Sequence, residues 1–222
     1  EAKMNPAELG FSMPPEWSQH LATLMEFPVR EALWPEPFED ILEAYGDIVK
    51  KISRFEPVKL VVRPDMVEKA VEVCGPDIEI LQMEHNDSWM RDNGPTFVKN
   101  DRGEIAAINW KFNAWGEKYP YEMDDLVAPK VLEALGVPRF DVPIVLEGGS
   151  IHVDGEGTLI TTEQCLLNKN RNPNLTKGEI EDVLKNNLNV KKIIWLKQGL
   201  YGDDTDGHVD NVACFARPGV IL

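Results

Sequence analysis

The sequence has few of the residues that hold small secreted domains together or that let a chain cross a membrane. It contains three cysteines, Cys74, Cys165 and Cys214, an odd number with no C-x-x-C pair and no zinc-ribbon spacing. This argues against a disulfide framework and for free thiols in a reducing compartment, the cytoplasm. The longest apolar runs, such as LVV and IIWL, are too short to span a bilayer, so we expect no membrane segment and no signal peptide.

Basic residues are also scarce, with 23 lysines and arginines against 38 aspartates and glutamates and a net charge of −15. This balance disfavours a nucleic-acid partner, because phosphate binding needs a basic surface. It is compatible with a small cationic substrate, whose local concentration a negative potential raises. Solubility alone is the simpler explanation of the charge.

What the sequence does contain is an ordinary globular composition, 43% hydrophobic and 27% charged, with patterns of helices and strands. The first 37 residues read as an irregular wrapping segment, with Trp17, Phe27, Trp34 and the following Phe38 on the core. Helices are predicted over 38–54, from Pro64, over 124–135, and after the capping box Thr176-x-x-Glu179, and strands over 58–62, 78–83 and 192–196.

A degenerate repeat organises the chain. Segments 90–110, 145–164 and 204–222 each carry an acid, a glycine, a strand, a turn with glycine and a second strand. Their acids, Asp92, Glu147 and Asp206, are 55 and 59 residues apart. The repeating unit is strand, helix, strand, hairpin, which predicts a fan or propeller of small α/β blades with the three acids facing one centre.

The last repeat contains GDDTDGHVDN, residues 202–211. On a strand, His208 and Asp210 would share one face, an arrangement suited to proton transfer or to metal binding. A calcium loop is excluded, because its pattern would place the first ligand at Gly202 and the closing glutamate at Ala213.

The two earlier repeats add a cation site. In NDSWMRDNGP, Asp92 can face a cationic ligand while Trp89 stacks on it, although N-G and G-P also mark a simple turn. In EGGS, Glu147 ends a strand before a flexible bend, and the repeat is what favours a functional role for it.

Two other chemistries are weaker. The three H-x-D pairs, at His85, His152 and His208, suggest a metal-dependent hydrolase, but they do not occupy equivalent places in the repeat and no H-E-x-x-H occurs. Thiol catalysis is disfavoured, because Cys165 falls at the far end of its hairpin from the acids, and all three cysteines read better as buried structural thiols.

The motifs WMRDNGP, LEGGSIHVDGEGTLITTEQCLLNKNRNP and GDDTDGHVDN together resemble the agmatine deiminase family of the guanidine-modifying, or pentein, superfamily. The bacterial peptidylarginine-type deiminases are its sister group. The resemblance extends over residues 13–222. It implies an α/β, five-bladed pentein-type propeller, of which about three blades would be present here. It also implies hydrolysis of agmatine to N-carbamoylputrescine and ammonia without a metal or organic cofactor, and it leaves a homo-oligomer open.

By motif match, the resemblance assigns roles to residues of this sequence. Asp92 and Asp210 would grip the guanidinium, and Glu147 and His208 would be the acid–base pair. Trp89 would line the pocket. Asp204, less firmly assigned by the motifs, would hold the chain or far amine of the substrate.

The sequence departs from the family in one respect. The family's nucleophile is a cysteine in a glycine-rich segment near the C-terminus, and no such segment occurs before Leu222. We therefore expect residues 1–222 to be a single catalytic domain, truncated or completed by another chain, and inactive alone. Three alternatives stay open, namely an arginine or peptidyl-arginine deiminase, a metal-dependent hydrolase, and a non-catalytic guanidine- or polyamine-binding module.

Overall fold

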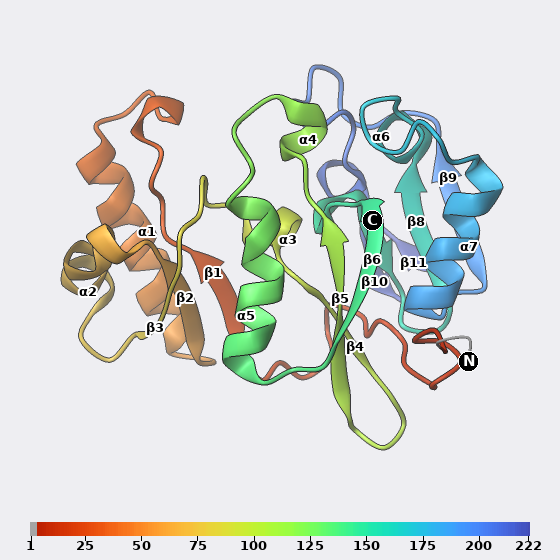
Figure 1. Cartoon of the computed structure of the whole chain (residues 1–222), viewed down its shortest axis with the longest axis horizontal. Coiled ribbons are helices and arrows are strands. Elements are labelled where there is room, and N and C mark those ends of the chain that lie inside the picture. The colour runs from red at the N-terminus through yellow and green to blue at the C-terminus, as the bar shows by residue number, and fades with distance from the viewer. Residues whose placement is uncertain (1–3) are drawn as a thin grey trace.

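The computed structural model describes residues 4–222. The N-terminal part of the chain forms a fully parallel sheet (Figure 1). The two crossovers of this sheet are helical, as parallel pairing requires. Its strands are β1 (Thr23–Glu26), β2 (Val58–Val62) and β3 (Glu79–Gln82), and its helices are α1 (Phe38–Ser53) and α2 (Val67–Cys74).

The second and third sheets repeat one plan. In each, an antiparallel hairpin is followed by a helix, which leads to a third strand parallel to the second. The second sheet contains β4 (Thr96–Lys99), β5 (Ile105–Lys111) and β6 (Arg139–Val145), with α5 (Val127–Leu135) between β5 and β6. The third contains β7 (Ile151–Val153), β8 (Thr158–Thr162) and β9 (Lys192–Leu196), with α7 (Lys177–Leu188) between β8 and β9.

A last hairpin and several single turns complete the described chain. The hairpin is β10 (Phe215–Arg217) with β11 (Val220–Ile221). The short α-helices are α3 (Met90–Asn93), α4 (Ala114–Glu117) and α6 (Glu163–Leu166). The 3₁₀ turns are η1 (Glu31–Leu33), η2 (Pro64–Met66), η3 (Asp124–Leu126), η4 (Gly148–Ser150) and η5 (Val209–Asn211).

The predicted mixed α/β fold and the three hairpins are therefore confirmed. The described residues form separate sheets and no closed barrel. Of the predicted helices, 124–135 begins as the 3₁₀ turn η3 and becomes α-helical at Val127. Pro129 then falls in the first turn, where a backbone N–H has no intrahelical partner to lose. The capping box at Thr176 is present as expected.

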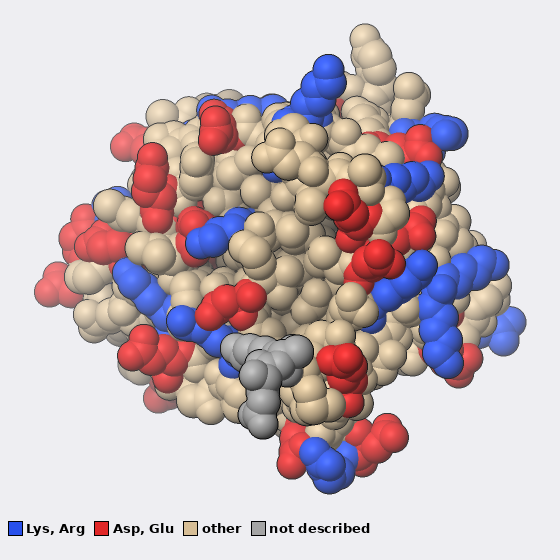
Figure 2. Space-filling model, turned by 45° about the vertical axis from the view of Figure 1, so that its right-hand side comes forward, with Lys and Arg blue, Asp and Glu red and all other residues tan. Residues whose placement is uncertain are grey.

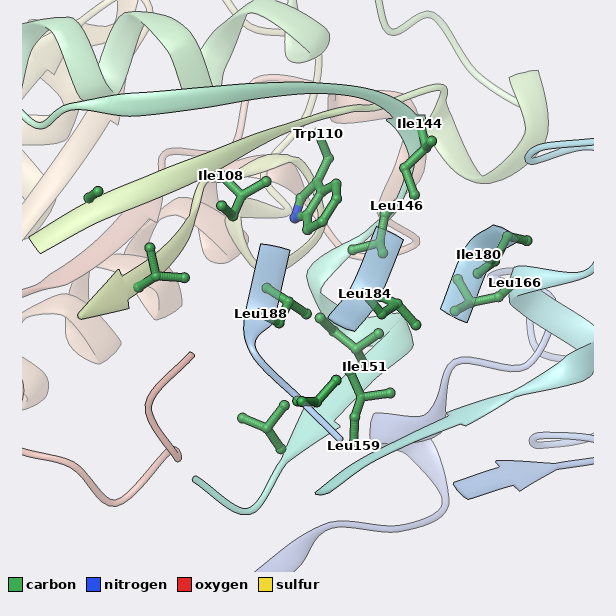
Figure 3. Close-up of a cluster of buried hydrophobic side chains, with 14 residues drawn as sticks. Ile108, Trp110, Ile144, Leu146, Ile151, Leu159, Leu166, Ile180, Leu184 and Leu188 are labelled. Atoms are coloured by element: carbon green, nitrogen blue, oxygen red, sulfur yellow. The ribbon is translucent and has the colours of Figure 1, made fainter. Parts of the chain in front are cut away.

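Two main hydrophobic clusters hold the sheets. The larger lies between the second and third sheets and α7, where Ile108, Leu146, Leu159 and Leu184 interdigitate (Figure 3). The other lies between the first sheet and its two helices. There Gly46 lets α1 approach α2 closely, because a side-chain carbon at that position would lie 2.3 Å from the Val73 carbonyl oxygen.

The N-terminal segment differs from its prediction in two ways. It is not wholly irregular, because it contains strand β1, and Trp34 stacks on Trp89 rather than joining a hydrophobic cluster, whereas Phe38 packs on the core as expected. Phe27 is fully buried, whereas Trp17 is 46% exposed and does not pack on the core. Phe11 and Met13 pack there instead. Residues 1–3 of the predicted segment lie outside the described residues.

The surface carries acidic and basic side chains interspersed with uncharged ones on the face that Figure 2 shows. Among residues 4–222, no helix combines the length and the apolar character that a bilayer crossing requires.

Candidate active site

Three chain segments converge on the backbone of Gly149. A side-chain carbon at Gly149 would lie 2.6 Å from Asp210 Oδ2, 2.6 Å from His208 Nδ1 and 2.7 Å from Asp92 Oδ1. Only glycine leaves space for three polar groups at this point. The loop after β6, the helix α3 and the loop after β9 thus bring their functional side chains together, although these are far apart in sequence.

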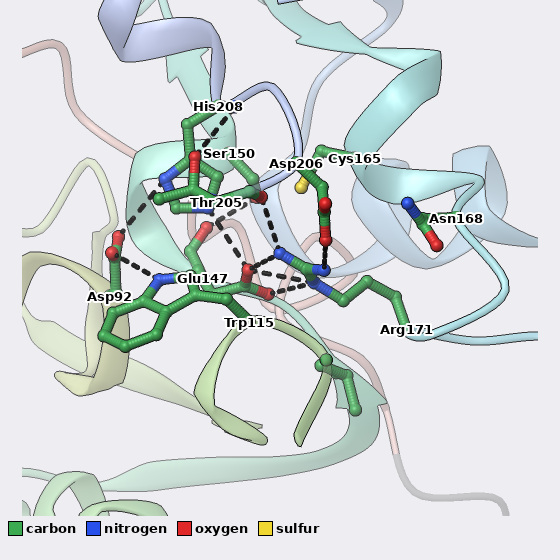
Figure 4. Close-up of polar contacts among 12 residues, drawn as sticks. Asp92, Trp115, Glu147, Ser150, Cys165, Asn168, Arg171, Thr205, Asp206 and His208 are labelled. Carbon is green, nitrogen blue, oxygen red and sulfur yellow. Dashed lines mark hydrogen bonds and ion pairs between the residues drawn. The ribbon is translucent and has the colours of Figure 1, made fainter. Parts of the chain in front are cut away.

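His208 lies at the centre of this group (Figure 4). Its Nε2 is 3.2 Å from Glu147 Oε1, and its Nδ1 is 3.7 Å from Asp92 Oδ1 and 4.0 Å from Asp210 Oδ1. Burial acts to lower the pKa of His208, but hydrogen bonding to Cys165 and Glu147 and the charge of Asp92 raise it to about 11. His208 is therefore an imidazolium at neutral pH.

Glu147 is kept ionised by an arginine that sequence analysis missed. Arg171 donates from Nε and Nη2 to Glu147 Oε1 at 3.0 and 2.6 Å, and from Nη1 to Asp206 Oδ2 at 2.8 Å (Figure 4). It also donates to the Thr205 carbonyl at 2.8 Å, so it ties Glu147 to the loop that carries His208. Burial acts to raise the pKa of Glu147, but the bonds from His208 and Arg171 hold it below its ordinary value.

Asp92 is held by neutral donors rather than by a cation in direct contact. It accepts from the Gly149 amide at 3.0 Å and from Trp115 Nε1 at 2.9 Å. Burial raises the pKa of Asp92, and the nearby charge of His208 opposes this. Trp115 has left-handed backbone angles (φ 57°, ψ 37°), as does Ala114 (φ 51°), so the loop spends backbone strain to aim the indole at Asp92.

Asp210 is the most accessible carboxylate of the group, with a side chain 39% exposed. Burial raises its pKa, and the charges of His208 and Arg91 act against this. The prediction that His208 and Asp210 lie on one strand is wrong. They flank the start of the turn η5, and it is this turn that brings them within 4.0 Å of each other.

A cavity of about 240 Å³ opens beside these groups. Its walls are largely aromatic, with carboxylates at separate places along it. It is lined by Leu33, Trp34, Asp87, Trp89, Asp92, Trp115, Tyr119, Asp204 and Thr205. Trp89 stacks with Trp34 at 6.2 Å between ring centroids, and Asp204 accepts from the Tyr119 hydroxyl at 2.8 Å. Aromatic faces and carboxylates are the surfaces that an extended organic cation prefers.

The sequence matches the profile of the Porphyromonas-type peptidyl-arginine deiminase family over residues 12–222. The chain belongs to this family. It is 50% identical to the agmatine deiminase of Pseudomonas syringae pv. tomato over 220 residues, which cover 96% of this chain and 60% of that protein. It is 44% identical to a putative agmatine deiminase of Shewanella baltica over 222 residues, with 98% and 60% covered.

Solved structures agree with this assignment. The agmatine deiminase of Enterococcus faecalis superposes with a TM-score of 0.95 at 42% identity, over 100% of this chain and 62% of that one. A putative peptidyl-arginine deiminase gives a TM-score of 0.86 at 35% identity, over 96% and 64%. The resemblance to agmatine deiminases drawn from the motifs is thus confirmed. The chain spans about 60% of the length of the curated relatives it matches.

The family motifs contain one residue that the repeat misplaced. Asp206 was expected to face the same centre as Asp92 and Glu147, but it pairs with Arg171 and with Lys118 instead. The reason is local, because Asp206 (φ 62°) and Gly207 (φ 89°) are left-handed and turn the chain so that His208 enters the centre.

Cys165 also lies elsewhere than expected. Its Sγ belongs to a group with Glu147 and His208 whose ligand atoms are all within 4.8 Å of one another, because α6 folds back after β8. Burial raises the pKa of the Cys165 thiol, and the thiol does not line the cavity. Cys74 is buried as expected, whereas Cys214 is exposed, so its prediction as a buried thiol is wrong.

Glu147, Cys165 and His208 are the one group of three metal-ligand types that the described residues bring together. The donor types would suit zinc. However, Glu147 already accepts from the buried Arg171, and a protonated His208 offers no lone pair. The other histidines of the H-x-D pairs do not join the group. Both ring nitrogens of His85 face backbone carbonyl oxygens, and Nδ1 of His152 accepts from the Phe215 amide.

Proposed function

We propose that this chain carries the guanidine-binding and proton-transfer groups of an agmatine deiminase, a hydrolase of the C–N bonds of linear amidines. The products would be N-carbamoylputrescine and ammonia, which connects the enzyme to putrescine and polyamine metabolism. The observation that carries the proposal is the placement of Asp92, Asp210 and the Glu147–His208 pair around one point beside an aromatic, acidic cavity. The names of the most similar relatives favour agmatine as the substrate.

In this proposal, Asp92 and Asp210 hold the guanidinium. A guanidinium is planar, always charged and presents several N–H donors, so two carboxylates on one side of it give charge-assisted bonds and a fixed orientation. Trp89 supplies an aromatic wall for the butyl chain. Asp204, at another part of the cavity lining, receives the far ammonium.

The chemistry that follows requires a thiolate. The sulfur attacks the guanidinium carbon to form a tetrahedral adduct, and the C–N bond breaks as His208 gives its proton to the departing ammonia. Neutral His208 then takes a proton from water, whose oxygen attacks the same carbon to give a second tetrahedral adduct. The C–S bond breaks to release the thiolate, and the remaining hydroxyl proton is lost to solvent as the ureido carbonyl forms. Glu147 serves by keeping His208 protonated in the resting enzyme.

We propose that the nucleophile is a cysteine other than Cys165. The Cys165 thiol is fully buried, and its pKa is raised by burial. A reactive cysteine needs access to substrate and a depressed pKa. On this basis the 222-residue chain alone should bind agmatine but release no ammonia.

We further propose that the sheets are blades of a five-bladed pentein propeller, three of them in this chain. The shared hairpin, helix and parallel strand of the second and third sheets support this repeat. The β10–β11 hairpin would begin a further unit. The three free thiols favour the cytoplasm as compartment.

Arginine or peptidyl-arginine is the second candidate substrate, because the matching family is described as peptidyl-arginine deiminase. Arginine carries an α-carboxylate beside the amine in which agmatine ends. The cavity carboxylates Asp87 and Asp204 would repel that group, although Arg30 pairs with Asp87. Agmatine should therefore bind more tightly than arginine.

Calorimetric titration of the chain with agmatine and with arginine tests the proposal. Asp92→Asn and Asp210→Asn should each weaken agmatine binding by about tenfold or more, the scale of a lost charged hydrogen bond. Asp101→Asn, in the exposed β4–β5 turn, is the matched control and should bind normally. Unchanged binding by both site variants would rule out the guanidinium clamp.

Two further measurements separate the remaining alternatives. A metal-dependent hydrolase would release ammonia from agmatine and lose that activity to a chelator. A non-catalytic binding module would bind agmatine yet show no hydrolysis even when a cysteine-containing C-terminal region from a relative is supplied. The proposed deiminase needs that region and is indifferent to chelation.

A further inference from the structure

We propose that Glu26 is a positioning residue for Asp92, and that it acts as a neutral carboxylic acid paired by two hydrogen bonds with the side-chain amide of Asn93. The inference rests on the proposed function for the role of Asp92. The pairing itself is drawn from the contacts of Glu26 and Asn93 alone.

The two side chains face each other in the interior. Asn93 Nδ2 donates to Glu26 Oε1 at 3.0 Å, and the residues are 5% and 0% exposed. The second oxygen of each group, Glu26 Oε2 and Asn93 Oδ1, is buried and has no donor. They are two of only four such side-chain atoms among residues 4–222.

One proton on Glu26 gives both of these oxygens a place in a hydrogen bond. A carboxylic acid is a donor through one oxygen and an acceptor through the other, and an amide is the same through its nitrogen and oxygen. With Oε2 protonated, Glu26 can donate to Asn93 Oδ1 while it accepts from Nδ2, and both groups are satisfied. An ionised Glu26 would leave two buried acceptors unpaired, which is costly in the interior.

The charges that surround Glu26 favour the neutral form. The like charges of Asp124 and Asp87 act on Glu26, and Tyr45 of α1 packs at the same strand end. Within residues 4–222 Glu26 forms no ion pair, since Arg30 is taken by Asp87. Burial and the charge of Asp124 hold the pKa of Glu26 well above its ordinary range, against the opposing bond from Asn93.

The pair joins β1 to α3, and Asp92 is the residue before Asn93. Helix α3 has four residues, too few to fix its own position, so its place depends on tertiary bonds. Glu26 is the last residue of β1. The pair thus sets where Asp92 stands relative to Gly149 and Trp115, the two donors that it accepts from.

Two substitutions distinguish this pairing from simple packing. Glu26→Gln keeps the shape and one donor beside one acceptor, so it can pair with Asn93 as the neutral acid does. Glu26→Met removes both bonds. Because Glu26→Met leaves Asn93 unpaired and can fail to fold, the double variant Glu26→Met, Asn93→Leu removes both polar groups together.

The protonation state has a direct signature. Infrared spectra at neutral pH should show a protonated-carboxyl band that Glu26→Gln removes. Urea unfolding should show the wild type losing stability relative to Glu26→Gln as pH rises. A raised folded pKa stabilises fully below the unfolded value, about 4.3, and this stabilisation fades toward the folded pKa. Absence of the band, or parallel pH profiles for the two proteins, would overturn the neutral pair.

The positioning role of Glu26 is tested by measuring whether the Asp92 carboxylate moves. The Trp115 indole N–H donates to Asp92, so its NMR resonance reports the position of that carboxylate. It should stay in place in Glu26→Gln and shift in Glu26→Met and in the double variant. Agmatine affinity should fall about tenfold in those two and remain normal in Glu26→Gln. An unmoved resonance in both would overturn the role, whereas failure of the wild type to bind agmatine would count only against the proposed function.

Discussion

Two buried carboxylates, Glu147 and Asp92, flank His208, and their surroundings shift their pKa values in opposite directions. Glu147 is fully buried and faces Arg171, which holds its pKa below the ordinary value. Asp92 is 9% exposed and faces an indole and a backbone amide, and burial raises its pKa.

The difference shows how one histidine can be served by two acids with distinct tasks. A permanently ionised Glu147 fixes the proton on His208. In the described part of the chain, Asp92 accepts hydrogen bonds only from neutral donors and lines the cavity, so an incoming cation can give it a charged hydrogen-bond partner. Environment rather than residue type divides the proposed roles of acid–base orienter and cation clamp.

The largest expected effect on stability comes from removing Arg171, the cation that pairs with Glu147. Arg171→Met leaves Glu147 without its guanidinium in a fully buried place, and breaking such a pair costs about 3–5 kcal/mol of stability. Urea unfolding measures this. Arg102→Met removes an exposed arginine that also pairs with a glutamate, so it should cost less than about 1 kcal/mol. Equal losses in the two variants would contradict the picture of Arg171 as the fixed partner of Glu147.

The titration of His208 compares the two carboxylates directly. Its pKa, raised to about 11, should fall more in Glu147→Gln than in Asp92→Asn, because Glu147 is the closer partner at 3.2 Å against 3.7 Å. NMR of the ¹⁵N-labelled imidazole measures both.

Stability should follow the same titration. A raised histidine pKa stabilises fully below the unfolded value of about 6.5, and that stabilisation is lost as pH rises toward 11. The wild type should therefore lose stability over this range, and Glu147→Gln should lose less. A His208 that titrates near 6.5 in the wild type would remove the basis of the comparison.

The point where the two sides meet is Gly149. Gly149→Ala puts a carbon within 2.6–2.7 Å of Asp92, His208 and Asp210, so those groups must separate. Overpacking of this kind costs about 1–3 kcal/mol, measured by urea unfolding, and it should also weaken agmatine binding. Gly178→Ala in α7 is the control, since its nearest neighbour would be 4.0 Å away. Normal binding by Gly149→Ala would show that the crowded geometry is not needed.

The sequence alone could predict the acids of the site, but not that Arg171 and Cys165 lie beside Glu147. Spacing of acids before glycines and alternating strands are local patterns, so Asp92, Glu147 and the three hairpins could be found. Arg171 could not, because nothing in NKNRNP distinguishes a fully buried arginine from a solvated one. Cys165 was placed on the wrong side, since a single turn of helix reverses the chain after β8.

Conformation at single residues accounts for the other misses. Asp206 turns away from the centre and His208 enters it because Asp206 and Gly207 have left-handed backbone angles. One of these, Asp206, is not a glycine, and positive φ angles are uncommon for non-glycine residues even though aspartate adopts them more often than most. Trp115 is similar, because its contact with Asp92 depends on a strained loop that no periodicity reveals.

The smallest expected effect concerns the neutral donors of Asp92. Trp115→Phe removes one indole bond to this carboxylate and should weaken agmatine binding by about 1.5 kcal/mol, the cost of one hydrogen bond to a charged group. Trp110→Phe is a matched control, because Trp110 is also buried and donates to Thr96 at 2.9 Å, away from the site. Both variants lose an indole N–H bond, and Trp115→Phe should lose more stability, because its bond goes to a charged group. Only Trp115→Phe should weaken agmatine binding, because only there does the lost donor leave Asp92 less well oriented toward the cavity. Equal agmatine affinities in the two variants would mean that the Gly149 amide alone holds Asp92.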